Sequence, residues 1–106
     1  MRRDVFQGLA DPTRREIMVL LSRKPMTPNA VAEHFDSTRQ AVSKHIRYLA
    51  ECDLVVQQQQ GREIYYRLNA PKMKEVDKWL AQFRKLWEDR FNQLDNVLLK
   101  LKTRKK

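Results

Sequence analysis

MTPNAVAEHFDSTRQAVSKHIRYLAECDL, residues 26–54, predicts two short helices joined by a tight turn. Thr27 is a candidate N-cap, and Pro28 suits the first position of the first helix. Ser37 followed by Gln40 matches a capping box, which predicts that a second helix begins directly after the turn. Apolar residues at spacings of three and four predict one packed face on that helix: Ala41, Val42, Ile46, Leu49 and Ala50. This arrangement is typical of a helix-turn-helix.

The other face of the second helix is polar and cationic, with no acidic residue between Ser37 and Ala50. Cations, amides and hydroxyls are the side chains that contact base edges and phosphates in a major groove. The residues predicted to contact DNA here are Thr38, Arg39, Gln40, Ser43, Lys44, His45 and Arg47. Among them, Arg39 and Gln40 are the best candidates for base edges, and Lys44 and Arg47 for phosphates. The alternative is a solvated cationic face on a helix-turn-helix that binds no nucleic acid.

A β-hairpin is predicted directly after this helix. Residues 54–56 and 64–68 have strand propensity, and QQQQGRE lies between them with Gly61 providing the turn. The predicted tip carries Gln57 to Gln60, Arg62 and Glu63. Alternation predicts that Ile64, Tyr66 and Leu68 face the core, with Tyr65 and Arg67 outside. Such a hairpin is a wing, and Arg62 is predicted to contact a phosphate or the adjacent minor groove.

Two shorter elements are predicted before the helix-turn-helix. Residues 1–10 carry an apolar strip on a short helix that is too small to be stable alone. Asp11 as N-cap and Pro12 then begin a second helix. Arg14 and Arg15 lie in its first turn, where cations oppose the helix dipole. They indicate a phosphate or an acidic neighbour there, or are simply solvated.

A long helix is predicted from Lys72 to Lys106, with Asn69 as its cap and Pro71 in its first turn. Its apolar residues recur at spacings of three and four and form a stripe too wide for a helix with one side in water. A second copy of the chain should cover this stripe, although the helix could instead fold back on its own domain. The residues predicted to form the homodimer are Val5, Phe6, Leu80, Phe83, Trp87, Phe91, Leu94 and Leu98.

The composition narrows the class of protein. The formal net charge of +9 favours an anionic partner, with nucleic acid the first candidate and an anionic membrane surface the second. No apolar run approaches the roughly 20 residues of a membrane span, and the N-terminus lacks a signal-peptide pattern, so we expect a cytoplasmic protein without a membrane partner.

Neither an enzyme nor a cofactor is expected. The chain has no glycine-rich phosphate loop, no Ser, His and Asp constellation, and no cluster of metal ligands. Its single cysteine, Cys52, excludes an internal disulfide, and a small half-buried residue in a turn is its simplest interpretation. A redox sensor is the alternative. Glu51 and Asp53 should raise the pKa of the thiol, which disfavours the reactive thiolate.

Three motifs in order resemble the ArsR family of winged helix-turn-helix transcriptional repressors: LADPTRREIMVLL at residues 9–21, TRQAVSKHIRYLAECDLV at 38–55 and GREIYYRLNA at 61–70. The resemblance implies a homodimer built on the first and last helices. It also implies that two reading helices meet successive major grooves of a palindromic operator, and that a signal relieves repression.

The chain departs from the metal-sensing members of that family. They carry a cysteine pair in the helix before the reading helix, where this chain has TPNAVAEHF. Others bind zinc through Asp, His and Glu on the last helix, but residues 71–106 contain no histidine. His34 and His45 are each isolated in sequence. No metal site is therefore expected, and no inducing ligand follows from these motifs.

The sequence predicts a mainly α fold with a small β-hairpin, as one winged helix-turn-helix domain over residues 1–106. Residues 1–70 should form the DNA-binding core with the wing at 54–68, residues 71–101 the dimerisation helix, and residues 102–106 a basic tail. The predicted function is a sequence-specific transcriptional regulator that binds double-stranded DNA as a repressor. The alternative is a winged-helix module for protein interaction, although such a module needs no acid-free cationic face beside a polar wing.

Overall fold

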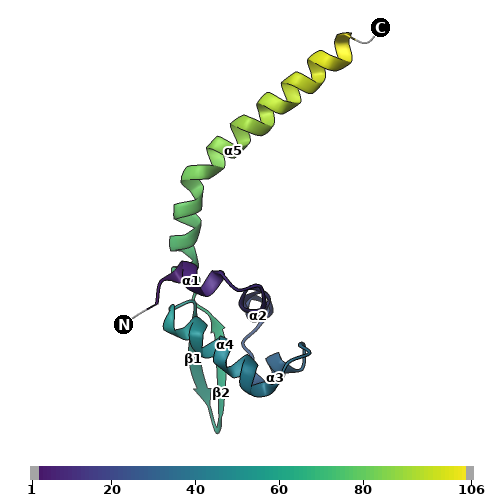
Figure 1. Ribbon diagram of the computed structural model, residues 1–106. Coiled ribbons are helices and arrows are strands. Elements are labelled where there is room, and N and C mark those ends of the chain that lie inside the picture. The colour runs from purple at the N-terminus through teal and green to yellow at the C-terminus, as the bar shows by residue number, and fades with distance from the viewer. Residues whose placement is uncertain (1–2, 105–106) are drawn as a thin grey trace. The chain divides into compact units, whose positions relative to one another are not determined.

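The computed structural model describes residues 3–104, which form five helices and one hairpin within that range (Figure 1). In chain order these are α1 (Val5–Leu9), α2 (Pro12–Arg23), α3 (Pro28–Ala32), α4 (Arg39–Glu51), β1 (Val55–Gln60), β2 (Glu63–Leu68) and α5 (Ala70–Arg104). The mainly helical fold with a small hairpin is confirmed. Two compact units divide the chain, one ending at Met73 and the other beginning at Lys74, and each is described by itself.

The core of the first unit lies between the helices and the base of the hairpin. Its fully buried large side chains come from α2, α3, α4, the start of β1 and the residue before β1: Ile17, Val31, Val42, Ile46, Leu49, Leu54 and Val55. Met26, between α2 and α3, joins β2, because its N–H donates to Tyr66 O at 3.0 Å and its carbonyl accepts from Tyr66 N at 2.8 Å. The helix-turn-helix is thereby attached to the wing.

Helix caps begin the helices of this unit. Thr27 Oγ1 accepts a hydrogen bond from Ala30 N at 3.2 Å, with Pro28 next in the helix, as predicted. The capping box at Ser37 is wrong. Thr38 is the N-cap of α4 instead, since its backbone is extended and its Oγ1 accepts from Ala41 N at 3.1 Å. The helix-turn-helix therefore has the predicted order, with α4 starting one residue later.

The end of α4 directs the chain into the wing. Asp53 has a positive φ of 60°, the left-handed conformation that often follows a helix. Leu54 N donates to Leu49 O at 3.0 Å and Asp53 N donates to Ala50 O at 3.0 Å, which together make a Schellman motif. Leu49 and Leu54 are both fully buried, so the motif also places Leu54 in the core directly before β1.

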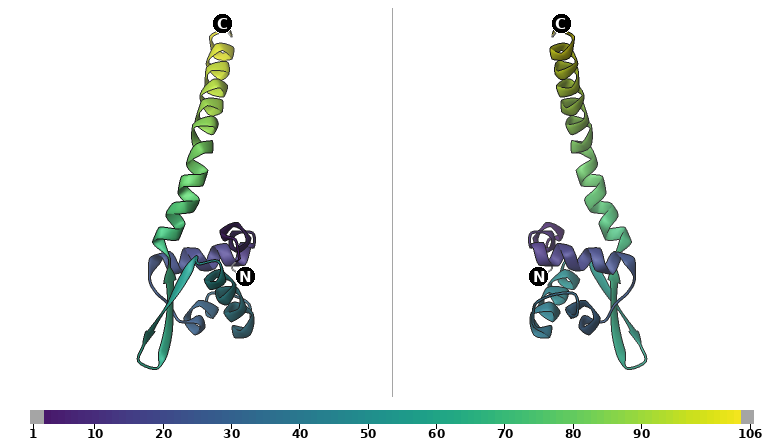
Figure 2. Two further views of the ribbon diagram at one scale, coloured as in Figure 1. Left: turned by 90° about the vertical axis from the view of Figure 1, so that its left-hand side faces the viewer. Right: turned by 90° about the vertical axis from the view of Figure 1, so that its right-hand side faces the viewer.

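The wing is an antiparallel hairpin in which Gln60 pairs with Glu63, leaving Gly61 and Arg62 as a two-residue turn. Gly61 has a φ of 63°, the conformation that a glycine tolerates at the first turn position. Four glutamines expected around the tip belong to strand β1 instead. The tip projects away from the helices of this unit (Figure 2).

The predicted alternation along β2 is partly wrong. The prediction places Ile64 in the core, but this residue is 42% exposed. Tyr66 and Leu68 are half-buried nearer the base, and Tyr65, expected outside, is half-buried too. Period-two alternation predicts which face a residue belongs to, but what covers that face depends on the tertiary fold.

Gly8 on α1 packs directly against the end of α4. A Cβ at this position would lie 2.7 Å from Leu54 Cδ1 and 3.0 Å from Cys52 Sγ, both on buried side chains. We expect Gly8→Ala to lower the free energy of unfolding by about 1–3 kcal/mol, because overpacking outweighs the gain in helix propensity. Urea denaturation followed by circular dichroism measures this. Unchanged or higher stability would show that α1 has room to move outward.

Asp11 gives the stability a predictable pH dependence. Its carboxylate accepts a hydrogen bond from Arg14 N at 3.0 Å, and this bond lowers the pKa of Asp11 below its ordinary 3.8. The stabilisation is therefore present above about pH 4 and is lost as the pH falls through the lowered pKa. Asn keeps the cap but does not titrate, so Asp11→Asn should lose less stability than the unchanged protein between pH 5 and pH 2 in urea titrations. Equal losses would contradict this role.

The second unit is part of a single helix, α5, which is 35 residues or about 52 Å long. Asn69 Oδ1 accepts from Lys72 N at 3.4 Å near its start, in keeping with the predicted cap. The helix continues through Arg104, so the segment assigned to a basic tail begins as helix, and residues 105 and 106 lie outside the described residues. In the described part of the chain, no helix is long and apolar enough to span a membrane.

The apolar stripe of α5 is largely uncovered. Phe91 is 66% exposed, and the rings of Trp79 and Phe83 contact each other with centroids 4.8 Å apart. The exposed large apolar residues of α5 are Trp79, Leu86, Trp87, Phe91, Leu94, Val97, Leu98, Leu99 and Leu101. Leu80 and Phe83 are half-buried. Of the two dimer candidates on α1, Val5 is buried within the core, whereas Phe6 is 39% exposed.

Candidate nucleic-acid interface

One face of α4 forms a shallow hollow of about 330 Å³ that is lined by polar side chains. The lining residues are Arg39, Gln40, Ser43, Lys44 and Arg47. Their spacing puts them on one side of the helix, and Val42, Ile46 and Leu49 on the buried side hold that face outward. The fold therefore brings together five of the eight residues predicted to contact DNA.

The other three predicted contacts lie elsewhere. Thr38 is exposed at the start of α4, and its hydroxyl already accepts the capping hydrogen bond. His45 is half-buried on another flank, since six residues after Arg39 correspond to about 240° around the helix. The charge of His45 contributes to the lowered pKa of Asp11, so His45 acts on the start of α2. Arg62 is exposed in the turn of the wing.

The side chains that line the hollow carry only positive charges. Glu51 is the one acidic residue of α4, and it lies in the last turn, away from the hollow. It forms an ion pair with Arg3 rather than with a cation of the hollow. Arg39, Lys44 and Arg47 thus remain directed at solvent without a carboxylate from their own helix.

Arg14 and Arg15 have a role that neither sequence interpretation included. Arg14 Nε donates to Gly8 O at 2.9 Å and Arg14 Nη2 donates to Gln7 O at 2.9 Å. Arg15 Nη1 donates to Leu9 O at 2.7 Å. These carbonyls end α1, where a helix has unpaired acceptors and a partial negative charge. The two arginines therefore stabilise the end of α1, so they are neither aimed at a phosphate nor simply solvated.

Tyr48, on the second half of α4, was also missed as a special residue. The Arg3 Cζ lies 4.0 Å from the centroid of its ring and the Arg14 Cζ lies 4.1 Å from it. Both guanidinium groups therefore make a cation–π contact with the same ring. The only sequence signal was an aromatic residue off the apolar face of the helix.

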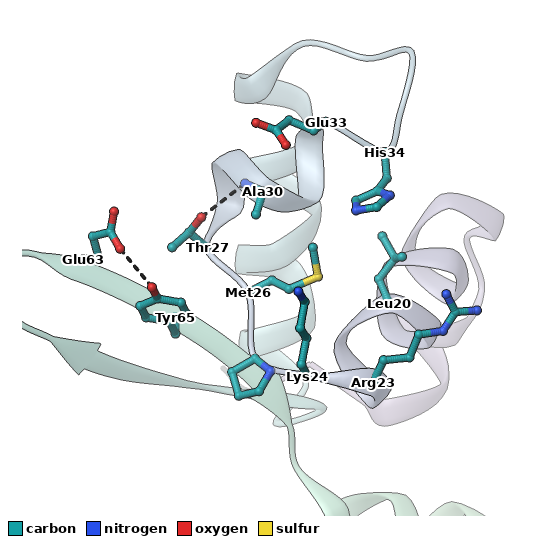
Figure 3. A pocket seen from close by; sticks show the side chains of 11 residues that line it. Leu20, Arg23, Lys24, Met26, Thr27, Ala30, Glu33, His34, Glu63 and Tyr65 are labelled. Carbon is teal, nitrogen blue, oxygen red and sulfur yellow. Dashed lines mark hydrogen bonds between the residues drawn. The ribbon is translucent and has the colours of Figure 1, made fainter.

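A larger pocket of about 700 Å³ lies between the end of α2, α3 and β2 (Figure 3). Arg23 and Lys24 line it from the end of α2, and Glu33 and Glu63 contribute carboxylates. The Tyr65 hydroxyl donates to Glu63 Oε2 at 3.0 Å, which raises the pKa of Tyr65. Because charges of both signs line this pocket and none of the predicted DNA contacts does, it does not extend the cationic surface of α4.

Cys52 is buried at the end of α4, more deeply than the half-buried turn residue that was expected. Burial is the main cause that raises the pKa of its thiol, and Glu51 adds to the shift. A raised pKa disfavours the thiolate that redox chemistry requires. Within residues 3–104, His, Cys, Asp and Glu side chains form no group of three that could hold a metal ion.

A helix-turn-helix whose polar second helix is followed by a hairpin with a cationic tip defines the winged helix-turn-helix class. A family model described as a helix-turn-helix domain matches residues 9–58. The chain is 34% identical over 80 residues to the transcriptional repressor SdpR of Bacillus subtilis, a match that covers 76% of this chain and 89% of that protein. The chain belongs to the ArsR family of winged helix-turn-helix transcriptional regulators.

Several solved structures are similar to this chain. An ArsR-like transcriptional regulator from Rhodococcus sp. RHA1 has a TM-score of 0.68 and 31% identity, and the match covers 88% of each chain. The cadmium sensor CmtR from Mycobacterium tuberculosis has a TM-score of 0.55 and 35% identity, with 68% of this chain and 77% of that one covered. The family assignment therefore agrees in sequence and in fold. Regulators of this class are DNA-binding proteins and not enzymes.

Proposed function

We propose that this chain is a homodimeric transcriptional repressor that binds a palindromic operator in double-stranded DNA. The observation that carries the proposal is the hollow on α4, where three cations, an amide and a hydroxyl share one exposed face. Donors of these types contact phosphates and base edges when a helix enters a major groove. The match to the repressor SdpR covers most of the chain and supports repression rather than activation. Such a regulator acts in the cytoplasm, where bacterial DNA is.

Each side chain of the surface has a proposed role. Arg39 and Gln40, in the first turn of α4, contact base edges, because the N-terminal residues of a recognition helix enter the groove. Ser43 and Thr38 donate from their hydroxyls to nearby phosphates, and Lys44, Arg47 and Arg62 neutralise phosphates. His45, half-buried on another flank, becomes the weakest candidate for a direct contact.

The dimer is proposed from the apolar stripe of α5. Large apolar side chains repeat along this helix and remain exposed within one chain, and such a surface is typical of a protein interface. A two-fold axis would place two copies of α4 on successive major grooves, which requires an operator with inverted symmetry. Phe6 of α1 adds to the same proposal, whereas Val5 has its own place in the core.

Selection of bound sequences from random double-stranded DNA tests the proposal. We expect an inverted repeat whose half-sites lie about one helical turn apart, or a multiple of it. A winged-helix module for protein interaction is the second candidate, and the exposed stripe of α5 is the observation that favours it. Enrichment of no sequence would overturn the repressor and support that module.

Arg62→Ala tests the role of the wing. Loss of one phosphate contact per subunit should reduce the slope of log affinity against log salt by about 1 to 2 for the dimer, with similar weakening on all DNA sequences. The measurement is fluorescence anisotropy of labelled operator and of unrelated DNA at several salt concentrations. Tyr65→Phe, on the same strand pair, serves as a control that keeps the charge. An unchanged slope would exclude Arg62 from the interface.

A further inference from the structure

The stack formed by Arg3, Tyr48 and Arg14 connects three elements at one aromatic ring. Tyr48 belongs to α4, Arg14 to the first turn of α2, and Arg3 precedes α1. Both guanidinium carbons lie about as close to the ring as a cation can, at 4.0 and 4.1 Å from its centroid. A surface tyrosine needs no such pair of cations to be accommodated in a fold.

Both arginines make further bonds that fix the stack to its surroundings. Arg3 forms an ion pair with Glu51, one turn after Tyr48 on α4, and this hydrogen bond raises the pKa of Arg3. Arg14 donates to the carbonyls of Gln7 and Gly8 at the end of α1. The ring is therefore connected to α1 through two arginines, because Arg3 directly precedes Asp4, the N-cap of that helix, and Arg14 binds the carbonyls at its end.

Tyr48 itself does not belong to the surface proposed for DNA. It is nine residues after Arg39 and does not line the hollow of Arg39, Gln40, Ser43, Lys44 and Arg47. Removing its ring would leave all five of those side chains on the same helix face. Any effect of Tyr48 on DNA binding must then act through the orientation of α4.

We propose that Tyr48 is a positioning residue whose ring, contacted by the guanidinium groups of Arg3 and Arg14, fixes α4 relative to α1 and so determines which half-site spacing the dimer accepts. The inference rests on the proposed homodimer and its palindromic operator. Rotation of α4 about this connection changes the separation of the two reading helices without changing which bases each one contacts. Specificity for spacing is then separable from specificity for sequence.

The test compares operators that differ only in spacing. Inverted repeats with the selected spacing, and with one or two base pairs added, are measured beside a single half-site. Each added base pair shifts a half-site by about 3.4 Å and rotates it by about 35°. The unchanged protein should prefer one spacing by at least about tenfold, or about 1.4 kcal/mol. In Tyr48→Leu this preference should fall to about threefold or less, with half-site affinity within about twofold.

Two further variants separate positioning from simple loss of structure. Tyr48→Phe keeps an aromatic ring for both guanidinium groups to contact and should retain the preference for spacing. Arg3→Gln removes one cation before the first helix, outside the core, and should weaken the preference as Tyr48→Leu does. In Tyr48→Leu, amide hydrogen exchange in α1 should also become faster, because Arg14 loses its second anchor.

The outcomes that oppose the inference are distinct from failure of the proposed function. Equal weakening of Tyr48→Leu on every DNA, single half-site included, would make the residue merely structural and overturn the inference. An unchanged spacing preference in both Tyr48→Leu and Arg3→Gln would also overturn it. If the unchanged protein binds no inverted repeat in preference to a half-site, the proposed dimeric repressor fails, and the inference fails with it.

Discussion

The Arg39→Ala, Lys44→Ala double variant is expected to bind the selected operator at least about 100-fold more weakly than the unchanged protein. Loss of a base contact costs about 1–3 kcal/mol, and loss of a phosphate contact adds to it. A dimer carries each substitution twice, so about 3 kcal/mol is the lower end of the expected change. Fluorescence anisotropy with labelled operator at one fixed salt concentration measures it.

The single variants separate the two kinds of contact. Arg39→Ala should relax preference at one base pair of each half-site and change affinity for unrelated DNA little. Lys44→Ala should instead weaken binding to all sequences and make the salt dependence shallower. Both side chains line the same hollow. A difference in DNA binding between the two single variants therefore reflects the kind of contact that each side chain makes and not its location.

The matched control is Lys78→Ala, Lys85→Ala, which makes the same change in net charge on α5. Both lysines are exposed, and both lie on the polar side of that helix. Their loss should change operator affinity by less than about threefold at physiological salt, because screening limits the effect of distant charges. If the α4 variant and this control bound equally well, the assignment of the hollow to DNA would be wrong.

Local rules predicted the helix-turn-helix well because its signals are local. Thr27 and Asp11 each accept a hydrogen bond from a backbone N–H three residues later, and this needs no tertiary information. The same reasoning placed the second cap at Ser37 instead of Thr38. Two adjacent hydroxyl residues offer equivalent acceptors, so local rules do not decide which of them is the cap.

The contacts of Arg14 and Tyr48 could not be predicted, because they depend on where α1 packs. A cation in the first turn of a helix looks unfavourable in sequence. In the fold it meets the carbonyl end of another helix, where a cation is favourable. Similarly, the cationic face of α4 was visible in the sequence, but the half-burial of His45 and its influence on Asp11 at the start of α2 were not. Tertiary placement thus decides which cations face outward.

The Phe91→Glu, Leu98→Glu double variant should convert the protein from a dimer into a monomer at micromolar concentration. Both side chains belong to the apolar stripe of α5 and are exposed within one chain. Burial of each large apolar side chain contributes about 1.5–3 kcal/mol, and a two-fold interface buries both of them twice. Carboxylates there must also be desolvated, so the dissociation constant should rise at least about a thousandfold, or about 4 kcal/mol. Sedimentation velocity over 1–100 µM measures the change.

The matched control for this variant is Asn92→Glu, Asn96→Glu. It adds the same two charges to the opposite, polar side of α5, and Glu has a higher helix propensity than Asn. This variant should remain a dimer, and circular dichroism should show equal helix content in both. Loss of the dimer in the stripe variant alone should also reduce operator affinity to that of a single half-site, because two linked sites then become independent. A stripe variant that stays dimeric, or an unchanged protein that is monomeric, would exclude α5 as the dimer interface.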